Sequence, residues 1–355
     1  MSERKYSFTE SRSKNGSELK EYILHLLKEV SFEEVASTAN KIREETKGNI
    51  VHLRALIEFS NYCRCNCLFC GIRRDNKKLP RYRMTEKEII NIAYEAAKSG
   101  YKTIVLQSGE DPFWDAKTLS RAIREIKKMN LAVTLSIGER SYDDYAKFRE
   151  AGADRYLLKF ETSDERLFMK LKPDTTLRKR IQCIRWLKKL GYETGSGIIV
   201  GLPGQSLESI SEDIYLFKEL DLDMIGVGPL IPHPDTPLAN FGVGNPIITL
   251  KIIAITRIIL PYANIPATTA LGTLSSDLRL KALNAGANVV MPDVTSEKYK
   301  KLYEIYPGKS LSKGSFEYWR EILSSINRTI GQDYGSVSRE YSTKVINGRK
   351  FTNAL

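Results

Sequence analysis

The chain has 355 residues, of which 42% are hydrophobic, so it is long enough for one large domain or two small ones. Its 55 Lys and Arg residues exceed its 43 Asp and Glu residues, which gives a net charge of +12. The basic residues are spread along the chain, often next to acidic ones. No dense basic run with interleaved aromatic residues indicates a nucleic-acid partner.

The sequence also argues against a membrane-embedded or secreted protein. The most apolar run, residues 252–262, contains Thr256, Arg257 and Pro261 and is too short to span a bilayer. The first residues lack the apolar stretch of a signal peptide. The five cysteines are few for a chain of this length, which fits a reducing compartment. We therefore expect a cytoplasmic protein without a membrane partner.

Two helices are predicted first, at about 17–29 and 31–47, within an N-terminal helical extension that covers residues 1–50. Strand-like segments then alternate with amphipathic helices, one of which (85–98) opens with a capping box at Thr85 and Glu88. The eight predicted strands are 51–60, 103–107, 132–136, 155–159, 193–200, 223–228, 265–269 and 288–291.

This alternation of strands and helices predicts an α/β fold, a (β/α)8 TIM barrel, over residues 51–306. A doubly wound sheet would give a similar alternation. Residues 307–355 are more polar and form a predicted C-terminal extension, with a helix near 315–326.

Four of the five cysteines lie within eight positions, directly after the first predicted strand: Cys63, Cys65, Cys67 and Cys70. Thiolates this close can surround one small inorganic group, and an iron–sulfur cluster is the natural candidate. Three thiolates on a four-iron cluster would leave one iron open, as in a catalytic zinc site. A four-cysteine zinc site is the alternative, and the spacing alone does not identify which cysteines are ligands. Cys183, in a helical stretch, is predicted to be a buried core residue.

The spacing Cys63-x3-Cys67-x2-Cys70, with Phe69 before the last cysteine, resembles that of the radical S-adenosylmethionine (SAM) superfamily. The resemblance implies that these three cysteines hold one 4Fe–4S cluster and that its free iron binds SAM. It also implies an external low-potential electron donor, whose electron cleaves SAM to methionine and a 5'-deoxyadenosyl radical. Cys65 would then be an extra thiol.

Other motifs fall at the ends of further predicted strands, where a TIM barrel carries its chemistry. Ser108, Gly109 and Glu110 resemble the superfamily element that holds the amino group of SAM, although Ser108 replaces a glycine. Glu161 could accept hydrogen bonds from a ribose, and Arg180 could pair with the carboxylate of SAM. An ordinary turn or a surface ion pair is the alternative in each case. The predicted cofactor-binding residues are Tyr62, Phe69, Gln107, Ser108, Gly109, Glu110, Thr134, Ser136, Glu161, Arg180, Pro229 and Leu230.

A polar cavity is predicted inside the barrel. Arg54 lies in the first strand, and if it points inward it needs an anionic partner, for which Glu58 is the one obvious acid. The predicted cavity residues are Arg54, Arg155, Lys159, Thr268 and Thr269, and they should attract an anion. The predicted catalytic residues, which come late in the chain, are Met291, Tyr303 and Tyr306; core packing is the alternative for Met291.

Seven segments together are similar to the HydE family, the radical SAM maturases of FeFe-hydrogenase in the biotin-synthase-like branch: 57–63, 71–76, 81–84, 106–112, 231–238, 265–269 and 306–309. The resemblance implies a small anionic or organometallic substrate, a cysteine-bound iron with carbonyl and cyanide ligands, and other hydrogenase maturases as partners.

The chain departs from this family at two points. Residues 307–355 contain no cysteine for a second cluster, and Lys159 stands where the family suggests Arg, which removes a planar fork of donors. Two other functions are kept as alternatives: a radical mutase of the methylornithine synthase type, and a non-catalytic cluster or electron carrier.

Overall fold

The computed structural model describes residues 14, 16–274, 276–309 and 314–337. The outer parts of the two predicted terminal extensions, 1–13 and 338–355, therefore lie outside the described residues. The boundaries of the extensions at residues 50 and 306 stay predictions.

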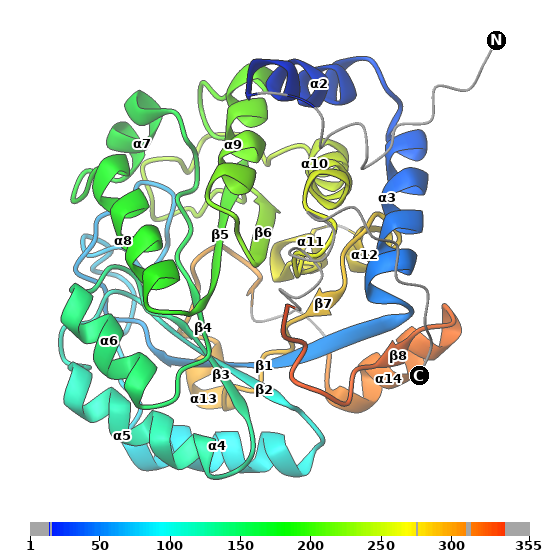
Figure 1. Cartoon of the computed structure of the whole chain (residues 1–355). Coiled ribbons are helices and arrows are strands. Elements are labelled where there is room, and N and C mark those ends of the chain that lie inside the picture. Colours follow the sequence, from blue (N-terminus) through cyan, green and yellow to red (C-terminus); the bar gives the residue numbers. More distant parts are fainter. Residues whose placement is uncertain (1–13, 15, 275, 310–313, 338–355) are drawn as a thin grey trace.

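A curled parallel sheet forms the centre of the molecule (Figure 1). Its strands run in the order β6-β5-β4-β3-β2-β1-β7, and β8 pairs with β1. The strands are β1 Ile50–Ser60, β2 Thr103–Ser108, β3 Ala132–Ser136, β4 Arg155–Leu157, β5 Glu193–Val200, β6 Met224–Pro229, β7 Val289–Val290 and β8 Thr329–Ile330. Helices surround this sheet, which confirms the predicted α/β, TIM-like fold.

The seventh predicted strand, 265–269, is wrong as an extended strand. Single bridges occur instead, from Asn264, just before the segment, to Met224 of β6 and from Pro266 to Val289 of β7. Proline has no N–H and cannot continue a strand ladder, which explains the interruption. Ala267 N still donates to Val289 O at 2.9 Å, so the segment joins β6 to β7 and closes the ring.

The helices follow the expected alternation, and the predicted capping box is present: Glu88 N donates to Thr85 Oγ1 at 3.2 Å and Thr85 N to Glu88 Oε2 at 2.8 Å. None of the helices in the described part of the chain combines the length and apolarity needed to cross a membrane. The helices are α2 Gly16–Lys28, α3 Phe32–Lys47, α4 Glu86–Lys98, α5 Ala116–Lys127, α6 Tyr142–Glu150, α7 Glu165–Leu171, α8 Leu177–Lys189, α9 Leu207–Glu219, α10 Pro246–Ile259, α11 Thr269–Gly272, α12 Arg279–Asn284, α13 Glu297–Lys300 and α14 Phe316–Ser325.

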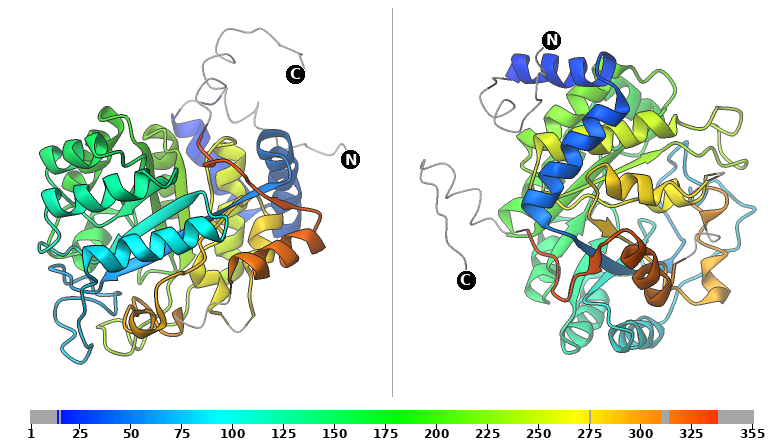
Figure 2. Two further views of the ribbon diagram at one scale, coloured as in Figure 1. Left: turned by 90° about the horizontal axis from the view of Figure 1, so that it is seen from below. Right: turned by 90° about the vertical axis from the view of Figure 1, so that its right-hand side faces the viewer.

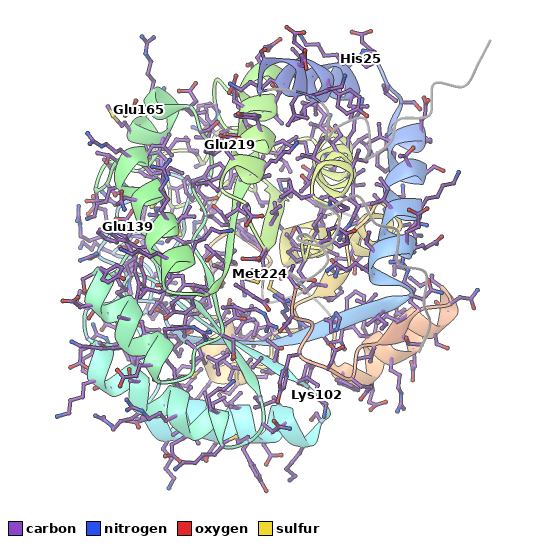
Figure 3. All side chains as sticks on the ribbon, viewed as in Figure 1. His25, Lys102, Glu139, Glu165, Glu219 and Met224 are labelled. Carbon is purple, nitrogen blue, oxygen red and sulfur yellow. The ribbon has the colours of Figure 1, made fainter. Side chains whose placement is uncertain are left out.

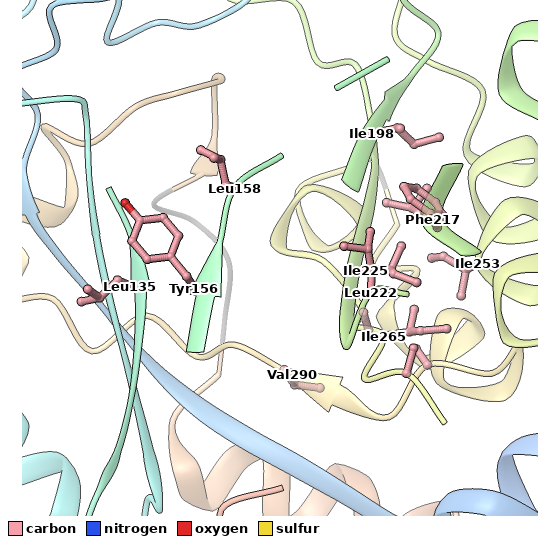
Figure 4. Close-up of a cluster of buried hydrophobic side chains, with 14 of the residues drawn as sticks. Leu135, Tyr156, Leu158, Ile198, Phe217, Leu222, Ile225, Ile253, Ile265 and Val290 are labelled. Atoms are coloured by element: carbon pink, nitrogen blue, oxygen red, sulfur yellow. The ribbon is translucent and has the colours of Figure 1, made fainter. Parts of the chain in front are cut away.

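The hydrophobic core lies between the sheet and its surrounding helices (Figure 4). Phe217 of α9 and Ile253 of α10 pack there near Ile225 of β6. The N-terminal helices join the same core, because α2 packs on α9 and α3 on α10. Leu26 of α2 and Leu323 of α14 are both fully buried in it. The terminal helices therefore brace the outside of the barrel.

The segment after β8 covers the amino end of the sheet. Tyr334 O accepts a hydrogen bond from Arg155 Nη2 at 2.7 Å, and Gly335 O accepts one from Asn264 Nδ2 at 2.8 Å. In the left view of Figure 2 this segment, in red, runs along one edge of the barrel, and the loop after β1, in light blue, projects from the other. The amino end of the barrel is thus covered by the segment after β8, whereas the carboxyl end, where the loop after β1 lies, is open.

Candidate active site

A cavity of about 350 Å³ opens among the carboxyl ends of the strands. This size suits a small ligand, and the position is the one at which TIM barrels carry their chemistry. All of the predicted site residues except Tyr62 and Arg155 line it. The structure therefore brings together residues from β1 to β6 and from segment 303–309, which are far apart in the sequence.

The two exceptions lie elsewhere. Tyr62 is half-buried behind the cysteine loop, where its ring lies 3.7 Å from the guanidinium carbon of Arg83. Arg155 is the first residue of β4 and so lies at the amino end of the barrel. Its Nε pairs with Glu193 Oε2 at 2.6 Å, and no part of it reaches the cavity. The placement of Arg155 in the cavity is therefore corrected.

The four clustered cysteines all line the cavity, and none is in a disulfide. Cys63 Sγ accepts hydrogen bonds from the backbone N–H groups of Cys65 and Glu110, each at 3.4 Å. Together with the Cys65 side chain, the strongest contributor, these bonds lower the pKa of Cys63 to about 7. Burial raises the pKa values of Cys67 and Cys70. In the described residues, no three His, Cys, Asp or Glu side chains converge as they would around a single metal ion.

Lys172 is a cavity residue that the sequence analysis missed. Its Nζ donates to Cys67 Sγ at 3.3 Å and lies 5.6 Å from the centre of the Phe69 ring. Burial disfavours the charge, but Cys67 and nearby carboxylates raise the pKa of Lys172, so it remains a cation. A buried cation beside a sulfur stabilises the thiolate form that a metal needs. The spacing of the cysteines carries no information about this residue, which lies more than a hundred positions away.

Gly109 allows the loop after β2 to pack against the cysteine loop. A Cβ at this position would lie 2.2 Å from Tyr62 O and 2.7 Å from Cys63 Cβ, so no side chain fits. Ser108 is accommodated at the replaced glycine because its hydroxyl donates to Gly109 O at 2.7 Å.

Arg180 is 4% exposed and lies between two buried carboxylates. Its Nε is 2.8 Å from Glu139 Oε1, and its Nη2 is 3.7 Å from Glu110 Oε1. Burial alone would raise the pKa of Glu110, but Arg180 and the Glu139 N–H keep it below its usual value. Glu139, which is labelled in Figure 3, was missed in the sequence. Because it pairs with Arg180, the arginine serves the fold as well as the cavity.

Glu161 and two glycines of β6, Gly226 and Gly228, line another part of the cavity. Glu161 has a φ of +66°, which is unusual for a residue with a side chain, and such conformations concentrate at functional sites. Its Oε2 is 2.9 Å from Lys159 Nζ. A Cβ on Gly226 would approach no atom more closely than 4.0 Å, and one on Gly228 none more closely than 3.4 Å. These glycines leave open wall at which a flat ligand can lie against the backbone.

Arg54 points inward, as predicted, but Glu58 is not its partner. Arg54 Nη1 donates to Met224 Sδ at 2.9 Å, and Nη2 donates to Gly335 O at 3.2 Å. Its Nε has no hydrogen-bond partner in the described part of the chain. Burial, followed by the charge of Arg155, lowers the pKa of Arg54 to about 9. Met224 lies near the centre of the view in Figure 3.

Glu58 belongs to a second network that the sequence analysis missed. Lys309, 2% exposed, forms an ion pair with Glu58 and lies 3.4 Å from Asp293 Oδ2. Gln107 Nε2 also donates to Glu58 Oε1, at 3.2 Å. Burial, with Asp293 adding to it and Lys309 opposing it, raises the pKa of Glu58 to about 8.

A barrel whose first loop presents closely spaced thiols to a cavity with carboxylates and cations is the architecture of a radical SAM enzyme, and the comparisons establish that class. The family model of the Radical SAM superfamily matches residues 57–234. The model of the Biotin and Thiamin Synthesis associated domain matches residues 227–317.

The chain is 50% identical to the [FeFe] hydrogenase maturase subunit HydE of Thermotoga maritima, over 86% of this chain and 89% of that protein. It is 33% identical to the 3-methylornithine synthase of Methanosarcina acetivorans, over 78% of each. The crystal structure of methylornithine synthase (PylB) superposes with a TM-score of 0.77 at 27% identity, over 96% of this chain and 99% of that one. The chain belongs to the HydE family within the radical SAM superfamily.

The superfamily implies a 4Fe–4S cluster and SAM as cofactors. The residues of this chain fit both. Three partly exposed thiols face the cavity, two of them supported by donors, and the glycine-lined wall leaves room for a nucleoside.

Proposed function

We propose that this chain binds one 4Fe–4S cluster through Cys63, Cys67 and Cys70, and SAM in the adjoining cavity. We further propose that it acts in maturation of the FeFe-hydrogenase active-site cluster. When reduced, the cluster with SAM supplies a 5'-deoxyadenosyl radical. The observation that carries the proposal is the 50% identity to a HydE maturase across nearly the whole length of both chains.

The chain's own residues divide the cofactor work among them. The N–H of Glu110 and the ammonium group of Lys172 would stabilise two of the cluster thiolates. Arg180, held by Glu139, would offer Nη groups to the carboxylate of SAM, and Glu161 would accept from its ribose. The low exposure of these groups strengthens each of these interactions.

The substrate side of the cavity carries more donors than acceptors. Arg54 contributes a cation that is not matched by a carboxylate hydrogen bond among the described residues. Burial raises the pKa values of Tyr303 and Tyr306, so both remain neutral phenols that can donate. With Thr268 and Thr269, these groups favour a small anionic substrate, such as a cysteine-bound iron with carbonyl and cyanide ligands.

The test is an anaerobic assay in two stages. The reconstituted protein with a low-potential electron donor should first form 5'-deoxyadenosine from SAM. Hydrogenase apoprotein and the other maturases should then yield active hydrogenase only when this chain is added. If 5'-deoxyadenosine forms but hydrogenase stays inactive, the maturation function is contradicted while the radical SAM chemistry stands.

A mutase of the methylornithine synthase type is the second candidate. The similarity to both the 3-methylornithine synthase sequence and the PylB structure favours it. The reconstituted enzyme incubated with SAM and a panel of amino acids, with formation of methylornithine followed by mass spectrometry, distinguishes it from the first.

A further inference from the structure

Three ionisable side chains form a buried network beside the cavity, and the proposed function does not yet use it. Glu58 on β1, Asp293 after β7 and Lys309 have side-chain exposures of 0%, 4% and 2%. A buried ion pair is a weak source of stability, because apolar side chains of similar volume often stabilise a fold as well. A network of this kind at the wall of an active site therefore points to a role in the site.

Glu58 connects this network to the cavity through Gln107. The two residues are direct neighbours across β1 and β2, and Gln107 lines the cavity. Gln107 Nε2 donates to Glu58 Oε1 at 3.2 Å. A glutamine amide has its donor and its acceptor on opposite sides. With Nε2 turned toward Glu58, the amide oxygen of Gln107 is left as the acceptor for a ligand.

Lys309 fixes Glu58 and also contacts the far wall. Its ammonium group lies between Glu58 and Asp293 and 5.5 Å from the centre of the Tyr303 ring. Lys309 and Tyr303 both line the cavity. One cation therefore ties the Gln107 side of the cavity to segment 303–309.

We propose that Glu58, held by Lys309, is a positioning residue for SAM. It keeps the Gln107 amide turned so that the carbonyl oxygen accepts a hydrogen bond from the amino group of SAM. Without Glu58 the amide is free to rotate and present its NH2 group, a donor facing a donor, to that amino group. This inference rests on the proposed function, since it requires SAM in this cavity.

The test measures the SAM dissociation constant of cluster-reconstituted variants by calorimetry, alongside their melting temperatures. Glu58→Leu, which removes both acceptor oxygens, should raise the dissociation constant about tenfold, as expected for the loss of one hydrogen bond to SAM. Gln107→Met, which removes the acceptor but leaves the ion pair, should do the same. Lys309→Arg keeps the charge and should retain most of the affinity.

Glu193→Gln is the matched control. Glu193 forms an ion pair with the fully buried Arg155 at the other end of the barrel, so this variant should melt at a lower temperature with unchanged SAM affinity. If Glu58→Leu lowers the melting temperature and leaves SAM affinity unchanged, as Glu193→Gln does, the network is structural and the inference is overturned. Should Glu58→Leu fail to fold, unchanged affinity in Gln107→Met overturns it equally. A wild-type protein that holds its cluster but binds no SAM would refute the proposed function itself.

Discussion

Buried charged side chains have different surroundings at the two ends of the barrel. At the amino end, Arg155 meets a carboxylate on β5 and a backbone carbonyl of the segment after β8, and that segment fills the opening. At the carboxyl end, Arg180 and Lys172 line a cavity of about 350 Å³, where Arg180 lies next to Glu110 and Lys172 next to Cys67. One end uses its charges to close the fold, and the other keeps them at the surface of a space for ligands.

Breaking the closed end should have the largest effect on stability. Arg155→Met removes one partner of a buried ion pair and leaves Glu193 without its cation, so about 3–5 kcal/mol of unfolding free energy should be lost. Urea unfolding measures the loss, and SAM affinity should stay the same. Weaker SAM binding with unchanged stability would instead show that Arg155 contributes to the cavity and not to the closed end.

Arg180 should show both kinds of effect. Arg180→Ala removes the proposed contact to the SAM carboxylate, which should weaken binding by about 1.5–3 kcal/mol, as for a hydrogen bond to a charged group. It also leaves Glu139, 3% exposed, without its buried partner, so the melting temperature should fall as well. The control is Lys179→Ala, because Lys179 is 58% exposed and 3.5 Å from the same carboxylate. That change should lower the unfolding free energy by less than about 1 kcal/mol. An unchanged melting temperature in Arg180→Ala would contradict the role of Arg180 in the fold.

The network at the open end should give a pH-dependent stability. The pKa of Glu58 is raised from 4.5 to about 8, so folding takes up a proton between these values. The unfolding free energy should therefore fall as pH rises through this window, by on the order of 1 kcal/mol per pH unit, and become level above it. Urea unfolding of the wild type and of Glu58→Gln, at steps of about one pH unit from pH 5 to 9, measures this effect. The difference between their unfolding free energies isolates the contribution of Glu58. A difference that stays constant with pH would show that Glu58 is ionised throughout.

Arg54 lies between the two ends and should matter least to stability. Its charge has no carboxylate hydrogen bond in the described residues, and Gly335 O keeps the Asn264 donor at 2.8 Å if Arg54 is removed. Arg54→Met should therefore change the unfolding free energy by less than about 1 kcal/mol, or raise it, because a costly desolvated charge is lost. Substrate conversion should fall while SAM binding remains. A large loss of unfolding free energy would show that Arg54, like Arg155, stabilises the closed end.

The sequence predicts the repeated elements of this fold well, since strands one to six have clear boundaries and strong apolar patterns. It fails where elements are short. The two residues of β8, Thr329 and Ile330, are too few to show alternation, and Pro266 interrupts a segment whose composition otherwise suits a strand.

In the site, the sequence predicts residues that belong to local motifs, such as the cysteines and Gly109. It misses Lys172, Glu139 and Lys309, which act through partners distant in the chain. Arg155 was misplaced because an inward-facing strand residue can lie at either end of a barrel, and only the register of β4 decides which.

The open end is proposed to hold one cluster on Cys63, Cys67 and Cys70. The most direct measurement replaces each of the four clustered cysteines by Ala and determines iron content and 5'-deoxyadenosine formation after anaerobic reconstitution. Wild type should bind about four irons per chain, as one 4Fe–4S cluster requires. The Cys63, Cys67 and Cys70 variants should lose both iron and activity, and Cys65→Ala should keep most of both. Loss in Cys65→Ala equal to that in Cys67→Ala, or about eight irons in wild type, would contradict the account.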